Sequence, residues 1–125
     1  MTRGRRHRPE RLAALIRETL AETITTRVKD PRVGFVTITG VQVAPDGSHA
    51  AVQVSVLGDE DAKQQALEGL QSARGFLRSD LAQRLTLRVT PDIAFSLDRG
   101  IEHAQRINQV LADLRRDQPD RTEEP

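Results

Sequence analysis

The feature that most constrains the fold is a helical stretch that is broken near its middle. Apolar residues recur at helical spacing before and after the short segment Ala73-Arg74-Gly75. A glycine inside a helix costs about 1 kcal/mol relative to alanine, so Gly75 needs a reason. One reason is structural, a kink or a close helix contact. The other is functional, a backbone brought close to a phosphate chain.

The N-terminal half of the chain predicts one helix and a β-hairpin. The helix begins near Pro9, and it ends at Asp30 because a residue that precedes proline avoids the helical region. Residues 36–43 and 52–56 then alternate apolar and polar side chains with the period of a strand. The alternation changes parity at Gly40-Val41, which predicts a β-bulge there.

The C-terminal half predicts a third strand and a last helix. The strand covers residues 87–97 with Pro91 inside it, which marks an edge strand or an interrupted one. The helix covers residues 101–114. The two helices around the break leave room for a right-handed parallel crossover, so the second strand takes the centre of the sheet and the helices cover one face. We therefore predict a single α+β domain over residues 9–116, in the order α-β-β-α-α-β plus a C-terminal helix.

Charge is distributed unevenly, although the net charge is only +1. Residues 1–11 hold five arginines against one acid, a local charge of +4, and residues 117–125 hold four acids against one arginine, a local charge of −3. We predict a flexible basic arm over residues 1–8 and a disordered acidic tail over residues 117–125. A basic arm suits phosphate binding, because neutralised phosphates release counterions; a solubilising end is the alternative.

The residue types give little support to catalysis. The chain has no cysteine, which excludes disulfides and thiolate metal sites and makes a cytoplasmic location the default. Its three histidines have no metal-ligand spacing and join no acid in a catalytic constellation. No Walker loop, dinucleotide fingerprint, signal peptide or membrane-spanning run occurs. We expect no enzyme activity, no cofactor, no metal and no membrane contact.

Aromatic residues are scarce, with three phenylalanines and no tyrosine or tryptophan. Domains that stack bases on a sheet need exposed rings on their strands, and we expect Phe35 and Phe95 in the core. A base-stacking sheet is therefore disfavoured. KH domains remain compatible, because they grip backbone nucleotides with a short glycine-containing loop between two helices.

Four segments in this order resemble the ribosome-binding factor A family of bacterial 30S assembly factors, over about Arg8 to Leu114. They are Val28–Gly34 with Val36–Thr39, Ala73–Arg78, Leu87–Phe95, and Asp98 before the last helix. The resemblance implies a type II KH-like domain in which Ala-x-Gly replaces the usual Gly-x-x-Gly loop and kinks the helix pair. Ala73-Arg74-Gly75 aligns with that element.

The resemblance also implies a function. It implies binding to the free 30S subunit and its 16S rRNA, and a non-catalytic role in late maturation that includes processing of the 16S 5′ end. Family members are linked to growth in the cold. We expect a monomer. Two alternatives stay open: a protein-interaction module that docks a partner on the third strand or last helix, and a KH-type binder of other RNAs.

Candidate RNA contacts lie at the break, after it and in the arm. They are Ala73, Arg74, Gly75, Arg78, Arg84 and Arg88, with Arg3, Arg5, Arg6, Arg8 and Arg11 in the arm and its continuation. The alternative for Arg74 and Arg78 is a solvated face paired with Asp80. Lys29 and Arg32 flank Asp30-Pro31, where a structural turn is the preferred interpretation.

Overall fold

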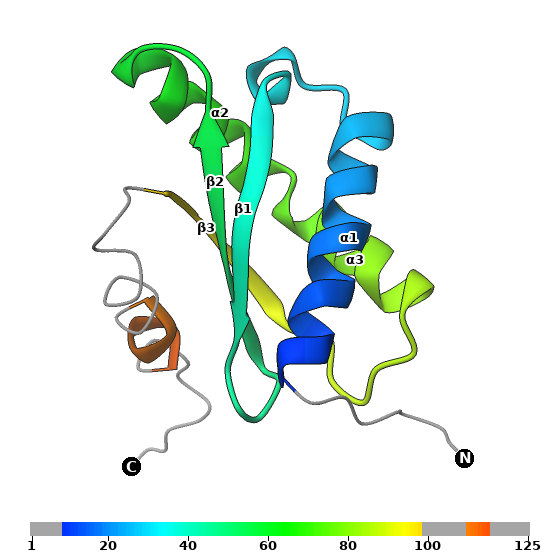
Figure 1. The fold of residues 1–125 in the computed structure, drawn as a ribbon. Coiled ribbons are helices and arrows are strands. Elements are labelled where there is room, and N and C mark those ends of the chain that lie inside the picture. Colours follow the sequence, from blue (N-terminus) through cyan, green and yellow to red (C-terminus); the bar gives the residue numbers. More distant parts are fainter. Residues whose placement is uncertain (1–8, 99–109, 116–125) are drawn as a thin grey trace.

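The computed structural model describes residues 9–98 and 110–115, and its elements follow the predicted order (Figure 1). They are α1 (Pro9–Arg27), the 3₁₀ turn η1 (Pro31–Val33), β1 (Val36–Val43), β2 (His49–Val56), α2 (Glu60–Ser72), α3 (Arg74–Arg84) and β3 (Asp92–Leu97). Residues 110–115 are helical and form the described part of the predicted last helix. The predicted arm and tail lie outside the described residues.

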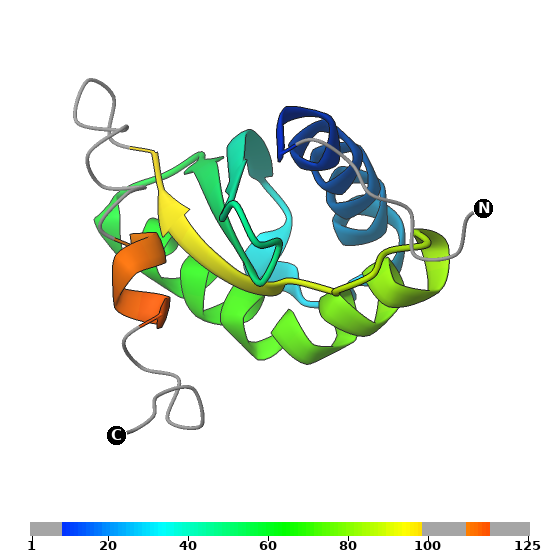
Figure 2. The ribbon, with the colours of Figure 1, turned by 90° about the horizontal axis from the view of Figure 1, so that it is seen from below.

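The three strands form one sheet in the order β1-β2-β3, so β2 is central as predicted. β1 and β2 are antiparallel and β2 and β3 are parallel, because the α2–α3 pair returns the chain to the same end of the sheet. Figure 2 shows α1 and α3 next to each other beside the sheet. Residues 110–115 lie across β3 from α1 in both views (Figures 1 and 2).

The predicted bulge is present, one residue earlier than expected. The register between β1 and β2 shifts between Ile38 and Gly40, so Thr39 is the extra residue. A one-residue change in the alternation would turn the following apolar side chains to the opposite face of the sheet. The extra residue of the bulge turns them back to the face that packs on the core. Apolar side chains on both sides of the bulge therefore pack in or against one core: Val36, Ile38, Val41 and Val43.

The core lies between the sheet and the helices. Its fully buried members include Ile16, Leu20, Leu70, Leu77, Leu81, Val52, Val54 and Ile93. Burial of each such side chain contributes about 1.5–3 kcal/mol. Phe95 joins this core as predicted, but the prediction for Phe35 is wrong, because its side chain is 73% exposed. Neighbouring residues of an extended chain point to opposite faces, and Val36 takes the inward position.

The third strand is interrupted at Pro91, and β3 begins only at Asp92. Proline has no amide hydrogen for the sheet, which separates residues 87–90 from the strand. Arg78 of α3 holds this entry to the strand: its Nη2 donates to the Thr90 carbonyl (2.9 Å) and its Nε lies 3.1 Å from Asp92 Oδ1.

Candidate nucleic-acid interface at the α2–α3 turn

The predicted break is a turn of one residue. α2 ends at Ser72, α3 begins at Arg74, and Ala73 between them has φ −87° and ψ 1°. The Ala73 N–H donates to the carbonyls of Gly69 and Leu70, both at 3.1 Å, so the turn stays hydrogen-bonded to α2. A single half-buried alanine therefore redirects the helix.

Gly75 is not required by packing. A Cβ built on it would meet nothing within 4 Å, and its backbone is outside the left-handed region. Gly75 therefore leaves an open, exposed patch of backbone in the first turn of α3. This result removes close packing as the explanation for this glycine.

The glycine that close packing does require is Gly69, which sequence reasoning did not single out. A Cβ at Gly69 would lie 3.0 Å from Val33 Cγ1, 3.2 Å from Arg32 Cβ and 3.3 Å from Asp30 Oδ2. The missing side chain lets α2 rest on η1. The available signal was its place beside Leu70 on the apolar stripe of α2.

The start of α3 has no side-chain cap, unlike the other two helix starts that have a described N-cap. Asp59 accepts the Ala62 N–H at the start of α2 (2.9 Å), and Asp30 accepts the Arg32 N–H at η1 (2.9 Å). Ala73 offers α3 no such acceptor. First-turn N–H groups lack intrahelical partners, so the start of α3 has donors for an anion. Its dipole adds little, because α2 ends one residue earlier and the negative end of that helix lies at the same turn.

Two cations lie at this turn. Arg74 is exposed and has no ion pair within the described part of the chain. Phe76 is 46% exposed, and the guanidinium of Arg27 lies 5.9 Å from the centre of its ring. Arg27 belongs to the last turn of α1. Sequence reasoning missed it, because only the packing of α1 against α3 brings it to the turn.

Asp80 pairs with neither Arg74 nor Arg78, although the alternative interpretation required it. Its side chain is only 6% exposed, and it accepts the Thr23 hydroxyl at 2.6 Å. It pairs with Arg27 Nη1 (3.3 Å) and Arg84 Nε (3.3 Å). Asp80 therefore links α3 to α1 and leaves Arg74 available.

The other predicted residues of α3 have partners or lie far from the turn. Arg78 is engaged at the start of β3, as described above. Arg84 contacts Glu22 (3.1 Å) as well as Asp80. Ten helical steps separate Arg74 from Arg84, roughly 15 Å. A basic surface along α3 would thus consist of one unpaired and two paired arginines.

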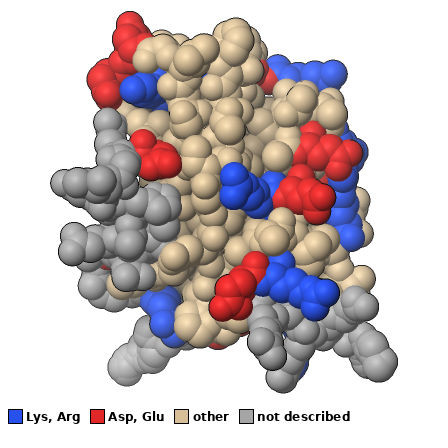
Figure 3. Space-filling model, in the orientation of Figure 1, with Lys and Arg blue, Asp and Glu red and all other residues tan. Residues whose placement is uncertain are grey.

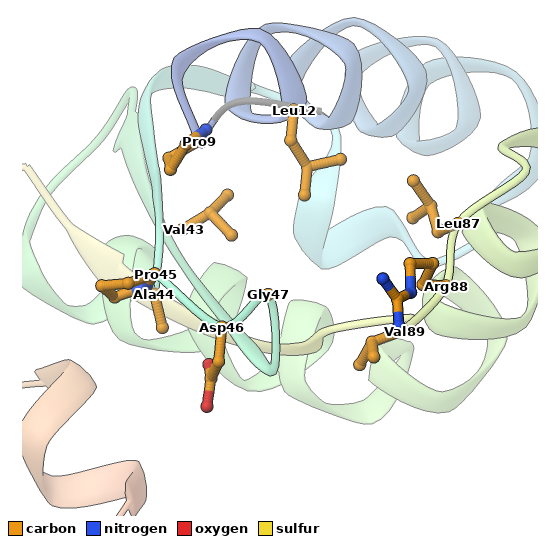
Figure 4. Close-up of a pocket in the computed structure, with 10 residues that line it drawn as sticks. All are labelled: Pro9, Leu12, Val43, Ala44, Pro45, Asp46, Gly47, Leu87, Arg88 and Val89. Carbon is orange, nitrogen blue, oxygen red and sulfur yellow. The ribbon is translucent and has the colours of Figure 1, made fainter. Parts of the chain in front are cut away.

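Arg88 lies at the other end of the domain. Figure 4 shows Leu12, Val43 and Leu87 directed into a cavity of about 390 Å³, with Arg88 at its edge.

Arg11 is exposed on α1, and no ion pair to it occurs among the described residues. Arg3, Arg5, Arg6 and Arg8 lie outside the described residues. The structure thus brings Ala73, Arg74 and Gly75 together and leaves Arg88 apart.

The Asp30-Pro31 motif is a structural turn, as preferred from the sequence. Arg32 Nη2 lies 2.6 Å from Asp30 Oδ2, which closes the turn at η1. Hydrogen bonds from Arg32 to the Asp30 carboxylate hold the pKa of Asp30 below its ordinary value.

On the face seen in Figure 3, basic and acidic side chains lie beside one another and form no single basic field.

Two other features were sought among the described residues, a metal site and a helix that could span a membrane. Residues 9–98 and 110–115 contain no group of three His, Cys, Asp or Glu side chains that could hold a metal ion. None of the described helices has the length and apolarity to cross a membrane.

Comparison with known families decides the identity of the fold. A sequence model for Ribosome-binding factor A matches residues 8–111, which include the α2–α3 turn and all three strands. The chain belongs to the ribosome-binding factor A family. The match starts just before α1 and extends into the helical residues 110–115.

Solved structures of ribosome-binding factor A are similar to this chain. The crystal structure from Thermus thermophilus is 32% identical, with a TM-score of 0.66, and the match covers 74% of this chain and 97% of that one. The solution structure of a ribosome binding factor A candidate from Thermotoga maritima is 36% identical, with a TM-score of 0.67, covering 75% and 90%. A Thermus thermophilus homology model fitted into a cryo-EM map of a complex with the 30S subunit is 32% identical, with a TM-score of 0.58, covering 70% and 92%.

Proposed function

We propose that this protein is a ribosome assembly factor that binds the free 30S subunit through 16S rRNA. It promotes late maturation of the subunit, including processing of the 16S 5′ end. The observation that carries the proposal is the exposed, uncapped and open start of α3 at Arg74 and Gly75. Membership of the family, and the Thermus homologue fitted into a 30S complex, support the choice of partner.

The contact begins with the phosphate backbone. A phosphate at the start of α3 accepts hydrogen bonds from first-turn N–H groups, and Gly75 permits the approach because no side chain blocks it. Arg74 adds a charge-assisted contact. Ala73 sets the direction of the helix and thereby the position of these donors. This mode of contact recognises the backbone and carries no base sequence.

Further arginines extend this contact. Arg11 and the arm residues Arg3, Arg5, Arg6 and Arg8 add salt-sensitive attraction. Arg78, Arg84 and Arg88 are outer contacts. The first two must exchange a carboxylate for a phosphate, because Asp92 holds Arg78 while Glu22 and Asp80 hold Arg84. We therefore assign the largest share of phosphate binding to Arg74.

The protein acts by binding, with no covalent step. A factor that binds one conformation of immature rRNA more tightly than another shifts the population toward it, and cleavage of the 5′ end falls to a separate nuclease. We propose that it does so as a cytoplasmic monomer without a cofactor.

Sucrose-gradient fractionation tests this function. The protein should co-migrate with free 30S subunits and not with 70S ribosomes. Arg74→Ala should weaken 30S binding several-fold and reduce the salt slope of binding to protein-free 16S rRNA by about 1. Arg115→Ala, the loss of one positive charge in the helical residues 110–115, should change neither. Equal behaviour of the two variants, or crosslinking mainly to mRNA, would contradict the proposal.

A further inference from the structure

An apolar pair is exposed at the end of the β1–β2 hairpin that is remote from its turn. Phe35 is 73% exposed and Leu57 is 75% exposed. The Leu57 N–H donates to the Phe35 carbonyl at 3.4 Å, and the next pair of the ladder is Val36 with Val56. Phe35 and Leu57 are therefore opposite one another. Residues opposite one another on paired strands point to the same face, so Phe35 and Leu57 present two exposed apolar side chains on one side of the hairpin.

The charge beside this pair is mainly negative, with three acids at the start of α2 against Lys63 in the same helix and Lys29 before η1. Leu57 is followed after one glycine by Asp59, Glu60 and Asp61, which begin α2. On the other side, Asp30 neutralises Arg32 at 2.6 Å. Figure 3 shows uncharged surface over the start of β1, with acidic groups and an adjoining basic group over the start of α2 and further basic groups on its other side.

We propose that this apolar–acidic patch (Phe35, Leu57 and Asp59–Asp61) docks a protein segment that presents apolar and basic side chains. The apolar pair gains by leaving water, and the acidic helix start attracts basic groups to its rim. The partner is a protein component of the ribosomal particle, so this inference rests on the proposed function.

The negative charge of the patch disfavours two other partners, RNA and a second copy of this chain. The three carboxylates outnumber the two neighbouring lysines, Lys29 and Lys63, so the patch repels RNA phosphates. A second copy of the chain in a two-fold dimer would set the same acids against each other. The patch and the α2–α3 turn lie at opposite ends of α2, twelve helical steps or about 18 Å apart. The protein can therefore contact RNA with one end of α2 and a protein with the other.

The first test compares two targets, intact 30S subunits and protein-free 16S rRNA. Phe35→Ser combined with Leu57→Ser should weaken binding to 30S subunits about tenfold and leave binding to free rRNA unchanged. Arg74→Ala should weaken both. Because both serine substitutions replace exposed side chains, thermal melting should be unaltered. Unchanged 30S binding of the double serine variant, or equal losses on both targets, would overturn the inference.

The second test reverses the charge of the patch. It asks whether the affinities for 30S subunits and for free rRNA change in opposite directions. Glu60→Lys combined with Asp61→Lys should lower affinity for 30S subunits and raise affinity for free rRNA. Glu10→Lys combined with Glu18→Lys makes the same change of charge on α1 and should not lower 30S affinity. A rise on both targets for the patch variant would assign the patch to RNA. A wild-type dimer in analytical ultracentrifugation that Phe35→Ser abolishes would assign it to self-association; either result overturns the inference. Wild-type protein that binds no 30S subunits contradicts the proposed function itself, and the partner named here falls with it.

Discussion

Gly69 and Gly75 lie six residues apart on the α2–α3 pair, and their surroundings are opposite. Gly69 is closed in by the side chains of Val33, Arg32 and Asp30, so it is required by the packing of α2 on η1. Gly75 faces open space, so the fold does not require it. The comparison teaches that a helical glycine is a candidate for function only where packing and backbone conformation leave it unexplained.

The largest expected effect is at the closed glycine. Gly69→Leu forces a side chain against Val33 and Asp30, so the free energy of unfolding should fall by about 2–3 kcal/mol. Urea denaturation measures the change. Gly75→Leu is the matched control and should lose less than about 0.5 kcal/mol, because exposed substitutions away from packed features are nearly neutral. Equal losses at the two positions would contradict the distinction between them.

A second prediction concerns the buried link between α3 and α1. Asp80→Ala leaves the buried Thr23 hydroxyl without its acceptor and should cost about 2 kcal/mol of unfolding free energy. Asp92→Ala removes a carboxylate from an exposed pair with Arg78 and should cost less than about 1 kcal/mol. Thermal or urea unfolding of both variants provides the comparison. A larger loss for Asp92→Ala would show that the link to α1 is not the stronger one.

The open glycine predicts a separation of stability from binding. Gly75→Ala should raise the free energy of unfolding by about 0.5–1 kcal/mol, because alanine reduces the freedom of the unfolded chain. It should nevertheless weaken binding to 16S rRNA, since the new methyl group occupies the surface offered to a phosphate. Urea denaturation and filter binding measure the two quantities. Unchanged rRNA affinity would show that the backbone of Gly75 is not approached.

The smallest effect is the pH dependence at η1, beside Gly69. Arg32 lowers the pKa of the Asp30 carboxyl below 3.8, its ordinary value. The folded state therefore binds this proton less readily than the unfolded state. The stabilisation is fully present above the unfolded pKa and is lost as pH falls through the folded pKa. Asp30→Asn should differ from wild type in unfolding free energy at pH 6, and the difference should shrink below pH 3.8. A constant difference down to pH 2 would contradict this assignment.

Periodicity predicted the elements, because each has a continuous apolar face. The change of parity near Gly40 predicted the bulge to within one residue. The position of Phe35 was not predictable from residue type, since an extended segment hides one side chain and exposes the next. Pro91 indicated an interruption of the third strand, but it did not show whether the residues before it or after it would pair with β2.

The candidate site was predicted only in its local part. Ala73, Arg74 and Gly75 are adjacent in the sequence, so the turn could be located from the pattern alone. Arg27 and Asp80 depend on the packing of α1 against α3, which brings together residues 53 positions apart. The roles of Gly69 and Gly75 likewise follow from neighbours that lie close only after folding.

Site-directed cleavage tests the central claim most directly, that the α2–α3 turn faces rRNA. The chain has no cysteine, so Ser72→Cys creates a unique attachment point for a hydroxyl-radical source beside the turn. Glu18→Cys on the exposed side of α1 is the control. In complexes with 30S subunits, we predict strong 16S rRNA cleavage from position 72 and weaker cleavage from position 18. Cleavage from position 18 without cleavage from position 72 would contradict the claim.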